Sequence, residues 1–214
     1  MLHWAGLRHS YPGRAQSIEY VDFTLLPGQH LLLRGASGSG KSTLLALLAG
    51  LLTVQSGQLR VAGTSLSELG PRALDAWRGQ TLGVVPQRLH LSHALTVEQN
   101  LQLPALAAGQ APNPARAAEL LAALGIAELG ARRPHELSVG QAQRAAVARA
   151  LMRRPRVLLA DEPSASLDDE HTARMLDLLL DAAGRESCTL VLATHDARVA
   201  ARLAAHGGVT ELRL

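Results

Sequence analysis

The sequence predicts an α/β fold in which helices cover a mainly parallel sheet and a helical lobe is inserted. Short apolar runs alternate with helical patterns, which favours parallel strands joined by helices. Between about residues 90 and 153 this alternation stops, because the segment is rich in alanine and leucine and shows no strand-like run. A third observation is a glycine-rich loop at residues 35–42, which separates an apolar run from a helical pattern.

The individual elements follow from apolar runs bounded by glycine, proline or polar residues. Strands are expected at 20–26, 30–34, 57–62, 81–85, 156–160 and 188–194, and helices at 41–52, 168–183 and 196–205. The residues Pro-Asn-Pro at 112–114 predict a break inside the lobe. With 214 residues and no recognisable linker, we expect residues 1–214 to form one domain, with the lobe at about 90–153.

Composition narrows the classes of protein. Hydrophobic residues make up 47% of the chain and aromatic residues only 2%, so the core must be built from leucine, alanine and valine. The net charge is +3, but the arginines are scattered. Their tightest cluster, Arg153, Arg154 and Arg156, follows a helical pattern. The negative end of a helix, at its C-terminus, attracts cations, and this explains the cluster as well as a nucleic-acid partner would. We therefore expect no nucleic-acid partner.

The termini and the single cysteine bear on the compartment. Cys188 lies in an apolar run and cannot form an internal disulfide, which fits a reducing, cytosolic environment. The first ten residues lack the long apolar core of a signal peptide. The longest apolar run, residues 44–54, is well short of the roughly 20 residues that cross a bilayer. A membrane role would then need a partner.

The glycine-rich loop predicts a polyphosphate site. Gly35, Gly40, Lys41 and Ser42 fit the pattern G-x-x-x-x-G-K-[ST], between an expected strand and an expected helix. Glycines let successive backbone N–H groups point inward, and the helix N-terminus adds positive potential. The context predicts a P-loop NTPase core, which by itself leaves kinases, GTPases, helicases and transport ATPases open. The predicted nucleotide ligands from the loop are Gly35, Ala36, Ser37, Gly38, Ser39, Gly40, Lys41, Ser42 and Thr43.

Lys41 is the only lysine among the 21 basic residues. An ammonium is a compact point charge that reaches the β- and γ-phosphates, whereas the broad planar guanidinium would not fit the same slot. We therefore interpret Lys41 as a catalytic residue. A flexible loop is the alternative interpretation of the segment.

A magnesium site is predicted from the groups that accompany the loop. Ser42 supplies a hydroxyl for Mg²⁺, and Asp161, at the end of an apolar run, would hold the ion through water. Glu162 follows directly and is expected to polarise the attacking water. The alternative is that the two acids form a solvated turn with Pro163.

The segment LSVGQAQRAAVARAL at 137–151 resembles the signature of ATP-binding-cassette (ABC) ATPases, which reads L-S-G-G-Q before a helix. The resemblance covers the whole chain and its motifs fall in the family's order. It implies that Tyr11 stacks on adenine, that Gln87 senses nucleotide and metal, and that His195 acts as a catalytic switch. It also implies that Ser138, Gly140, Gln141 and Asp168 contact nucleotide, and that the loop at 166–168 faces a partner subunit.

The resemblance further implies the architecture and the assembly. It implies an antiparallel β subdomain near the N-terminus and a homodimer with each ATP between one chain's phosphate loop and the other's signature. A separate transmembrane permease subunit is implied, with the ATPase peripheral on the cytoplasmic side of the cell membrane. One position departs from the pattern: Val139 replaces the first signature glycine. A side chain there requires a negative φ and an orientation away from the nucleotide.

Within the family, the short length and residues 95–109 are similar to the lipoprotein-release, macrolide-efflux and cell-division group. We therefore expect an ATPase that powers membrane transport. One alternative keeps the ATPase but has it drive a membrane partner that transports nothing. A DNA-repair cassette is disfavoured because residues 43–136 lack sustained heptads, and a small-molecule kinase leaves the signature unexplained.

Overall fold

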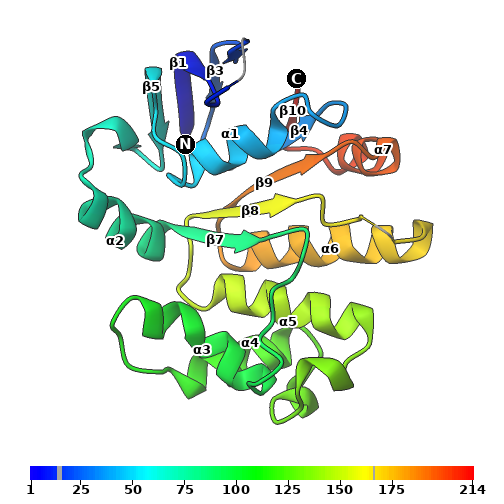
Figure 1. Ribbon diagram of the computed structural model, residues 1–214. Helices are drawn as coiled ribbons and strands as arrows, with labels where there is room; N and C mark the ends of the chain where they lie inside the picture. Colours follow the sequence, from blue (N-terminus) through cyan, green and yellow to red (C-terminus); the bar gives the residue numbers. More distant parts are fainter. Residues whose placement is uncertain (14–15, 166) are drawn as a thin grey trace.

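The computed structural model describes residues 1–13, 16–165 and 167–214. Within these residues a five-stranded sheet runs in the order β10 (Val209–Arg213), β4 (His30–Arg34), β9 (Thr189–Thr194), β8 (Val157–Asp161) and β7 (Leu82–Val85). All four neighbouring pairs are parallel. In Figure 1 the arrowheads of β7, β8 and β9 point the same way, so their carboxyl ends meet at one edge of the sheet.

A second sheet near the N-terminus is antiparallel, as expected. It contains β1 (Leu2–His9), β2 (Ile18–Glu19), β3 (Phe23–Leu25), β5 (Ser56–Val61) and β6 (Thr64–Ser65). The strand expected at 20–26 is wrong in its length, because only β3 lies within that range. The short strand β2 precedes it as a separate element. Tyr20, between them, donates its backbone N–H to Leu7 O at 3.0 Å.

Seven α-helices and three short 3₁₀ helices complete the described residues. They are α1 (Lys41–Leu48), α2 (Pro71–Thr81), α3 (Val97–Ala107), α4 (Pro114–Ala123), α5 (Val139–Leu151), α6 (Asp169–Arg185) and α7 (Ala197–His206), with η1 (Leu66–Glu68), η2 (Ala127–Leu129) and η3 (Pro134–Glu136). The helix expected at 41–52 ends at Leu48, because Gly50 adopts a φ of +63° that a right-handed helix cannot continue. Strands β1 and β10 and helix α2 were not predicted from the sequence.

The parallel sheet separates two hydrophobic cores. Alternate residues of a strand point to opposite faces, so Leu31 and Leu33 pack with α1 while Leu32 joins the other cluster. Figure 1 shows α1 on one side of this sheet and α5 and α6 on the other. Both faces are covered, which explains why the strands read as continuous apolar runs.

The helices α3, α4 and α5 lie together below the sheet in Figure 1, in the segment where the lobe was expected. Arg116 of α4 has a side chain only 4% exposed and pairs with Glu186, after α6, at 2.6 Å. This buried ion pair ties α4 to the end of α6. Within the described residues, no helix is both long and apolar enough to span a bilayer.

Candidate functional site

A pocket of about 510 Å³ opens at the carboxyl edge of the parallel sheet. It is bounded by the loop after β4, the start of α1 and the residues that follow β7, β8 and β9. Its lining residues are Tyr11, Pro12, Ile18, Ser37, Gly38, Gly40, Lys41, Ser42, Thr43, Gln87, Glu162 and His195. Eight of the predicted site residues therefore share a pocket with the predicted catalytic pair Glu162 and His195.

Glycine is required at both ends of the phosphate loop. At Gly40 the φ is +101°, and a Cβ would lie 2.9 Å from Ile18 Cγ2. A Cβ at Gly35 would lie 2.5 Å from Ser39 Oγ and 2.6 Å from Leu214 O. Helix α1 begins after Gly40 with no side-chain cap and no acid in its first turn. Its N-terminal N–H groups are thus left for an anion.

Lys41 is held by the loop it belongs to. Its Nζ donates to Gly35 O and to Ala36 O, both at 2.9 Å, and lies 3.7 Å from Glu162 Oε1. An ammonium has three donors, so these two carbonyls leave one N–H toward the pocket. The side chain is 5% exposed, which places a poorly solvated positive charge where polyphosphate would bind.

Ser42 lines the pocket, and Asp161, which does not, lies directly beside it. Ser42 Oγ donates to Asp161 Oδ1 at 3.3 Å. Burial raises the pKa of the Asp161 carboxyl above its ordinary value; Glu162 adds to the rise, while the Ser42 hydrogen bond and the Lys41 charge oppose it. A hydroxyl, a desolvated carboxylate and the nearby Gln87 amide are hard oxygen donors, so these groups fit a magnesium ion.

Glu162 contacts both Lys41, of the phosphate loop, and the residues at the end of β9. Its backbone has a φ of +45°, which is costly for a residue with a Cβ, and its N–H donates to Ala193 O at 2.8 Å. Its Oε1 lies 2.8 Å from His195 Nδ1, and its Oε2 accepts from Thr194 Oγ1 at 2.9 Å. The carboxylate therefore faces the predicted phosphate position with both of its oxygens engaged.

Tyr11 lies at the rim of the same pocket. Its hydroxyl is 3.0 Å from Thr43 Oγ1, and its ring packs edge-on against His9 with centroids 4.8 Å apart. These contacts fix an aromatic ring beside the phosphate loop, where adenine would lie. The stacking role remains a prediction.

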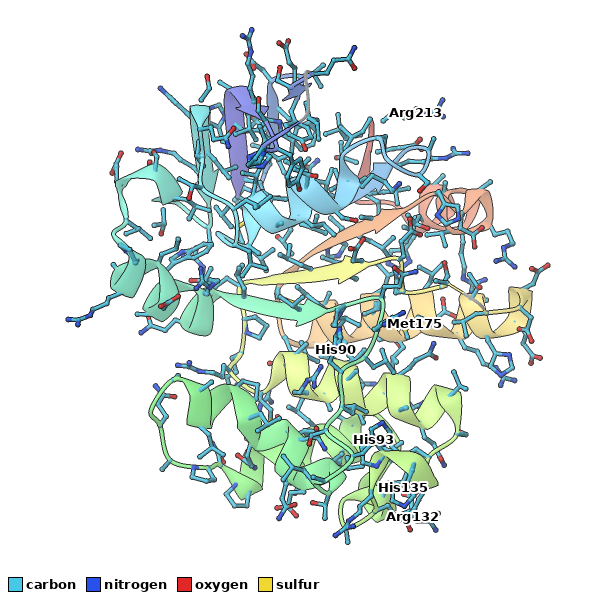
Figure 2. All side chains as sticks on the ribbon, viewed as in Figure 1. His90, His93, Arg132, His135, Met175 and Arg213 are labelled. Atoms are coloured by element: carbon cyan, nitrogen blue, oxygen red, sulfur yellow. The ribbon has the colours of Figure 1, made fainter. Side chains whose placement is uncertain are left out.

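Gln87 follows β7, and its loop is anchored by the signature helix. Arg149 of α5 donates to Leu89 O at 2.6 Å and to His90 O at 2.7 Å. Burial lowers the pKa of Arg149. Figure 2 shows His90 between the end of β7 and the helices below it. The loop after Gln87 is thus tied to α5 by the Arg149 side chain.

The signature residues lie in a different pocket, of about 430 Å³, that shares no lining residue with the first. Ser138 caps α5: its Oγ accepts from Gln141 N at 3.3 Å, and Gln141 Oε1 accepts from Ser138 N at 2.9 Å. Val139 is 65% exposed, begins α5 in a helical conformation and lines this pocket with α6 residues. Val139 therefore has the negative φ that a side chain at this position requires.

Asp168 also lies away from the phosphate pocket. It caps α6, where its Oδ1 accepts from His171 N at 2.8 Å, and this bond lowers the pKa of the carboxyl. Of the predicted segment 166–168, residue 166 lies outside the described residues. One chain therefore assembles the phosphate, metal and base groups, but not Ser138, Gly140, Gln141 or Asp168.

The family model described as ABC transporter matches residues 18–165, which is more than half of the 214 residues. The chain belongs to the ABC transporter family. It is thus an ATP-binding and ATP-hydrolysing cassette, which confirms the predicted family, fold and activity. The roles of the individual site residues remain predictions.

Two relatives and one solved structure show the range of the likeness. The chain is 44% identical over 202 residues to the macrolide export ATP-binding/permease protein MacB of Rhodopseudomonas palustris (strain HaA2), covering 92% of this chain but 31% of that protein. It is 38% identical over 206 residues to the lipoprotein-releasing system ATP-binding protein LolD of Chromohalobacter salexigens, covering 94% and 87%. A dimeric post-hydrolysis structure of the cassette MJ0796, bound to ADP and Pi, has a TM-score of 0.80 and 29% identity, covering 94% and 90%.

Some features of the cassette's site were missed by the sequence analysis. Pro12 and Ile18 line the pocket, and Thr194 binds the predicted catalytic carboxylate. Ile18 reaches the pocket because β2 pairs with β1. No local sequence pattern predicts this pairing. Pro12 follows Tyr11 directly, so the aromatic residue was the available signal for it.

Proposed function

We propose that residues 1–214 act as one nucleotide-binding domain of a membrane transporter and that two copies enclose ATP between them. The observation that carries this proposal is the separation of two pockets in one chain. Lys41 and Glu162 line one of them, and Ser138 and Gly140 line the other. A second copy, turned to face the first, brings a signature to each phosphate loop. The dimeric MJ0796 structure supports this arrangement.

The proposed chemistry is positioning together with electrostatic stabilisation. Mg²⁺, held by Ser42, Gln87 and, through water, Asp161, would neutralise charge on the phosphate oxygens. Lys41 holds the β- and γ-phosphates, and Tyr11 holds the adenine.

The reacting end of the pocket is formed by Glu162 and His195. Glu162 accepts a proton from the attacking water, and His195, at 2.8 Å from Glu162, steadies the developing negative charge. The signature of the partner subunit closes the site around the attacking water and excludes bulk solvent.

Mixing two inactive variants tests the shared site. Lys41→Ala and Ser138→Arg should each be inactive alone, because every site in either homodimer lacks one half. In a mixed dimer one site pairs an intact phosphate loop with an intact signature. Random pairing makes half of the dimers mixed, so recovery should reach at most about a quarter of the parental ATPase rate.

The mixing experiment needs a check that the variants fold and associate. The melting temperature of each variant and the ATP-driven dimerisation of the mixture provide it, measured in the assembled complex or at high protein concentration. Strong hydrolysis by either variant as a demonstrated monomer would refute the shared site.

We also propose a separate permease as the membrane partner, with the cassette peripheral on the cytoplasmic side. An apolar groove of about 370 Å³ is lined by residues that include Leu51, Val84 and Pro104. Leu51 is 67% and Val84 43% exposed. Arg149, which anchors the loop after Gln87, lines the same groove. A helix of the permease seated there would contact the segment that reaches the nucleotide, and the names of both relatives favour transport.

Two exposed leucines in loops provide a matched test of the groove. Leu51→Asp should reduce recovery of the cassette with its membrane partner about tenfold, because a desolvated carboxylate opposes apolar docking. Leu26→Asp, at a position 59% exposed outside the groove, should leave recovery unchanged. Both variants should bind ATP like the parent. Equal recovery of the two variants would move the docking site elsewhere.

A further inference from the structure

Thr194 lies beside the predicted catalytic carboxylate at the end of β9. The parallel register pairs Asp161 with Ala193, so the next residues, Glu162 and Thr194, are neighbours across the strand ends. Thr194 is 0% exposed and does not line the nucleotide pocket. Its Oγ1 lies 2.9 Å from Glu162 Oε2 and 3.0 Å from the backbone N of Asp196. The hydroxyl is therefore buried between two polar groups.

The direction of this hydrogen bond is fixed by its partners. The N–H of Asp196 can only donate, so it occupies a lone pair of Thr194 Oγ1. An ionised carboxylate can only accept, so the single hydroxyl proton of Thr194 points to Glu162 Oε2. Because the side chain is fully buried, water cannot supply a substitute donor.

The two side chains that contact the other oxygen, Oε1 of Glu162, are less constrained. His195 Nδ1, at 2.8 Å from Oε1, belongs to a side chain that is 62% exposed. Lys41 Nζ is 3.7 Å away and is already bound to two loop carbonyls. Both of these groups line the pocket, where nucleotide would engage them. The backbone N–H of His195 also donates to Oε2, at 3.4 Å. Thr194, at 2.9 Å, makes the shorter of these two bonds to Oε2, which lie outside the nucleotide-facing contacts.

We propose that Thr194 is a positioning residue for ATP hydrolysis: its hydroxyl fixes Oε2 of Glu162 so that Oε1 faces the attacking water. The inference rests on the proposed role of Glu162 as the base. A buried donor of this kind removes rotational freedom from the carboxylate before the transition state forms. Thr194 itself touches neither nucleotide nor water.

The test compares Thr194→Val, which keeps the shape but lacks the hydroxyl, with Thr194→Ser, which keeps the hydroxyl. In the full chain, Thr194→Val should lower kcat on the order of tenfold, equivalent to one lost hydrogen bond to a charged group, with KM for ATP changed less than about twofold. Thr194→Ser should restore kcat to within about threefold of the parent. A merely structural role would not split kcat from KM in this way.

Thr172→Val is the matched control. Thr172 is 2% exposed, and its Oγ1 has no hydrogen-bond partner among the described residues, so its loss should leave kcat unchanged and should not lower the melting temperature. If Thr194→Val melts well below this control, Thr194→Ser decides the matter. A serine variant that folds but is as slow as the valine variant would overturn the proposal.

A double variant separates this inference from the proposed function. In a Glu162→Gln background, Thr194→Val should cost no further rate, because an amide that cannot act on water gains nothing from being positioned. A further tenfold loss there would show that Thr194 acts through another group and overturn the proposal. Near-parental hydrolysis by Glu162→Gln would instead remove the base assigned to Glu162, whereas a slow Glu162→Gln with a fast Thr194→Val rejects the Thr194 role alone.

Discussion

The phosphate end and the signature end of the cassette are built in opposite ways. At the phosphate end, Lys41, Asp161 and Glu162 come from distant segments and contact other elements. At the signature end, polar groups bond within their own helix: Ser138 pairs with Gln141. The first is a cavity with directed charges. The second is a smaller site whose polar signature groups already pair within one helix.

The pKa values of two carboxyl groups, one at each end, are shifted in opposite directions. Burial raises the pKa of Asp161, whereas the backbone N–H of His171 lowers the pKa of Asp168. A desolvated carboxylate gains most from an opposite charge, so Asp161 is suited to a cation. Asp168 is already satisfied as a helix cap, and it can lie at a subunit boundary without a new partner.

The largest effect is expected from a substitution at the phosphate end. Glu162→Gln should bind ATP yet hydrolyse it at least about 100-fold more slowly, because the amide keeps the shape but cannot accept the proton of water. An ATP-bound dimer should accumulate, detectable by size exclusion with nucleotide. Glu68→Gln, at an exposed glutamate, is the control and should retain the parental rate. Turnover by Glu162→Gln near the parental rate would contradict the role of Glu162.

The residues of the phosphate end could be predicted from the sequence because they belong to local patterns. The glycines of the loop, Lys41 and the acids after an apolar run can be identified without knowing which strands pair. It could not place Thr194 against Glu162, because that contact depends on the register of β8 and β9, which are separated by α6. The strand β1 was missed because a register shift between Ala5 and Arg8 interrupts its alternation.

A smaller effect is expected at the signature end. Val139→Gly restores the family's glycine and should leave ATP hydrolysis within a few-fold of the parent, because the Ser138–Gln141 capping box does not involve the valine side chain. Stability should fall by less than about 0.5 kcal/mol, because valine is itself a weak helix former and Val139 is the first residue of α5. Steady-state ATPase assays and melting curves measure both. A hundredfold rise in rate would show that the valine obstructs the signature.

The smallest expected effect concerns His30, which begins β4 at the opposite end of the sheet from the pocket. His30 Nδ1 accepts the backbone N–H of Leu190 at 3.0 Å, so the ring must be unprotonated on that nitrogen. Burial, with a smaller contribution from nearby His206, lowers the pKa of His30 below its ordinary 6.5. The folded chain then binds this proton less readily than the unfolded chain does.

The sign of the pH dependence follows from that difference. Above about pH 6.5 His30 is neutral in both states and costs nothing. As the pH falls below that value the unfolded chain takes up the proton first, so stability declines until the pH passes the folded-state pKa. His30→Asn offers an amide oxygen to Leu190 without titrating, so its melting temperature should fall less than the parent's between pH 7.5 and 5.5. His206→Gln should reduce the decline only partly. Because neither residue lines the nucleotide pocket, ATP affinity at pH 7.5 should be unchanged in both variants; a loss of affinity would show that the two ends of the sheet are coupled.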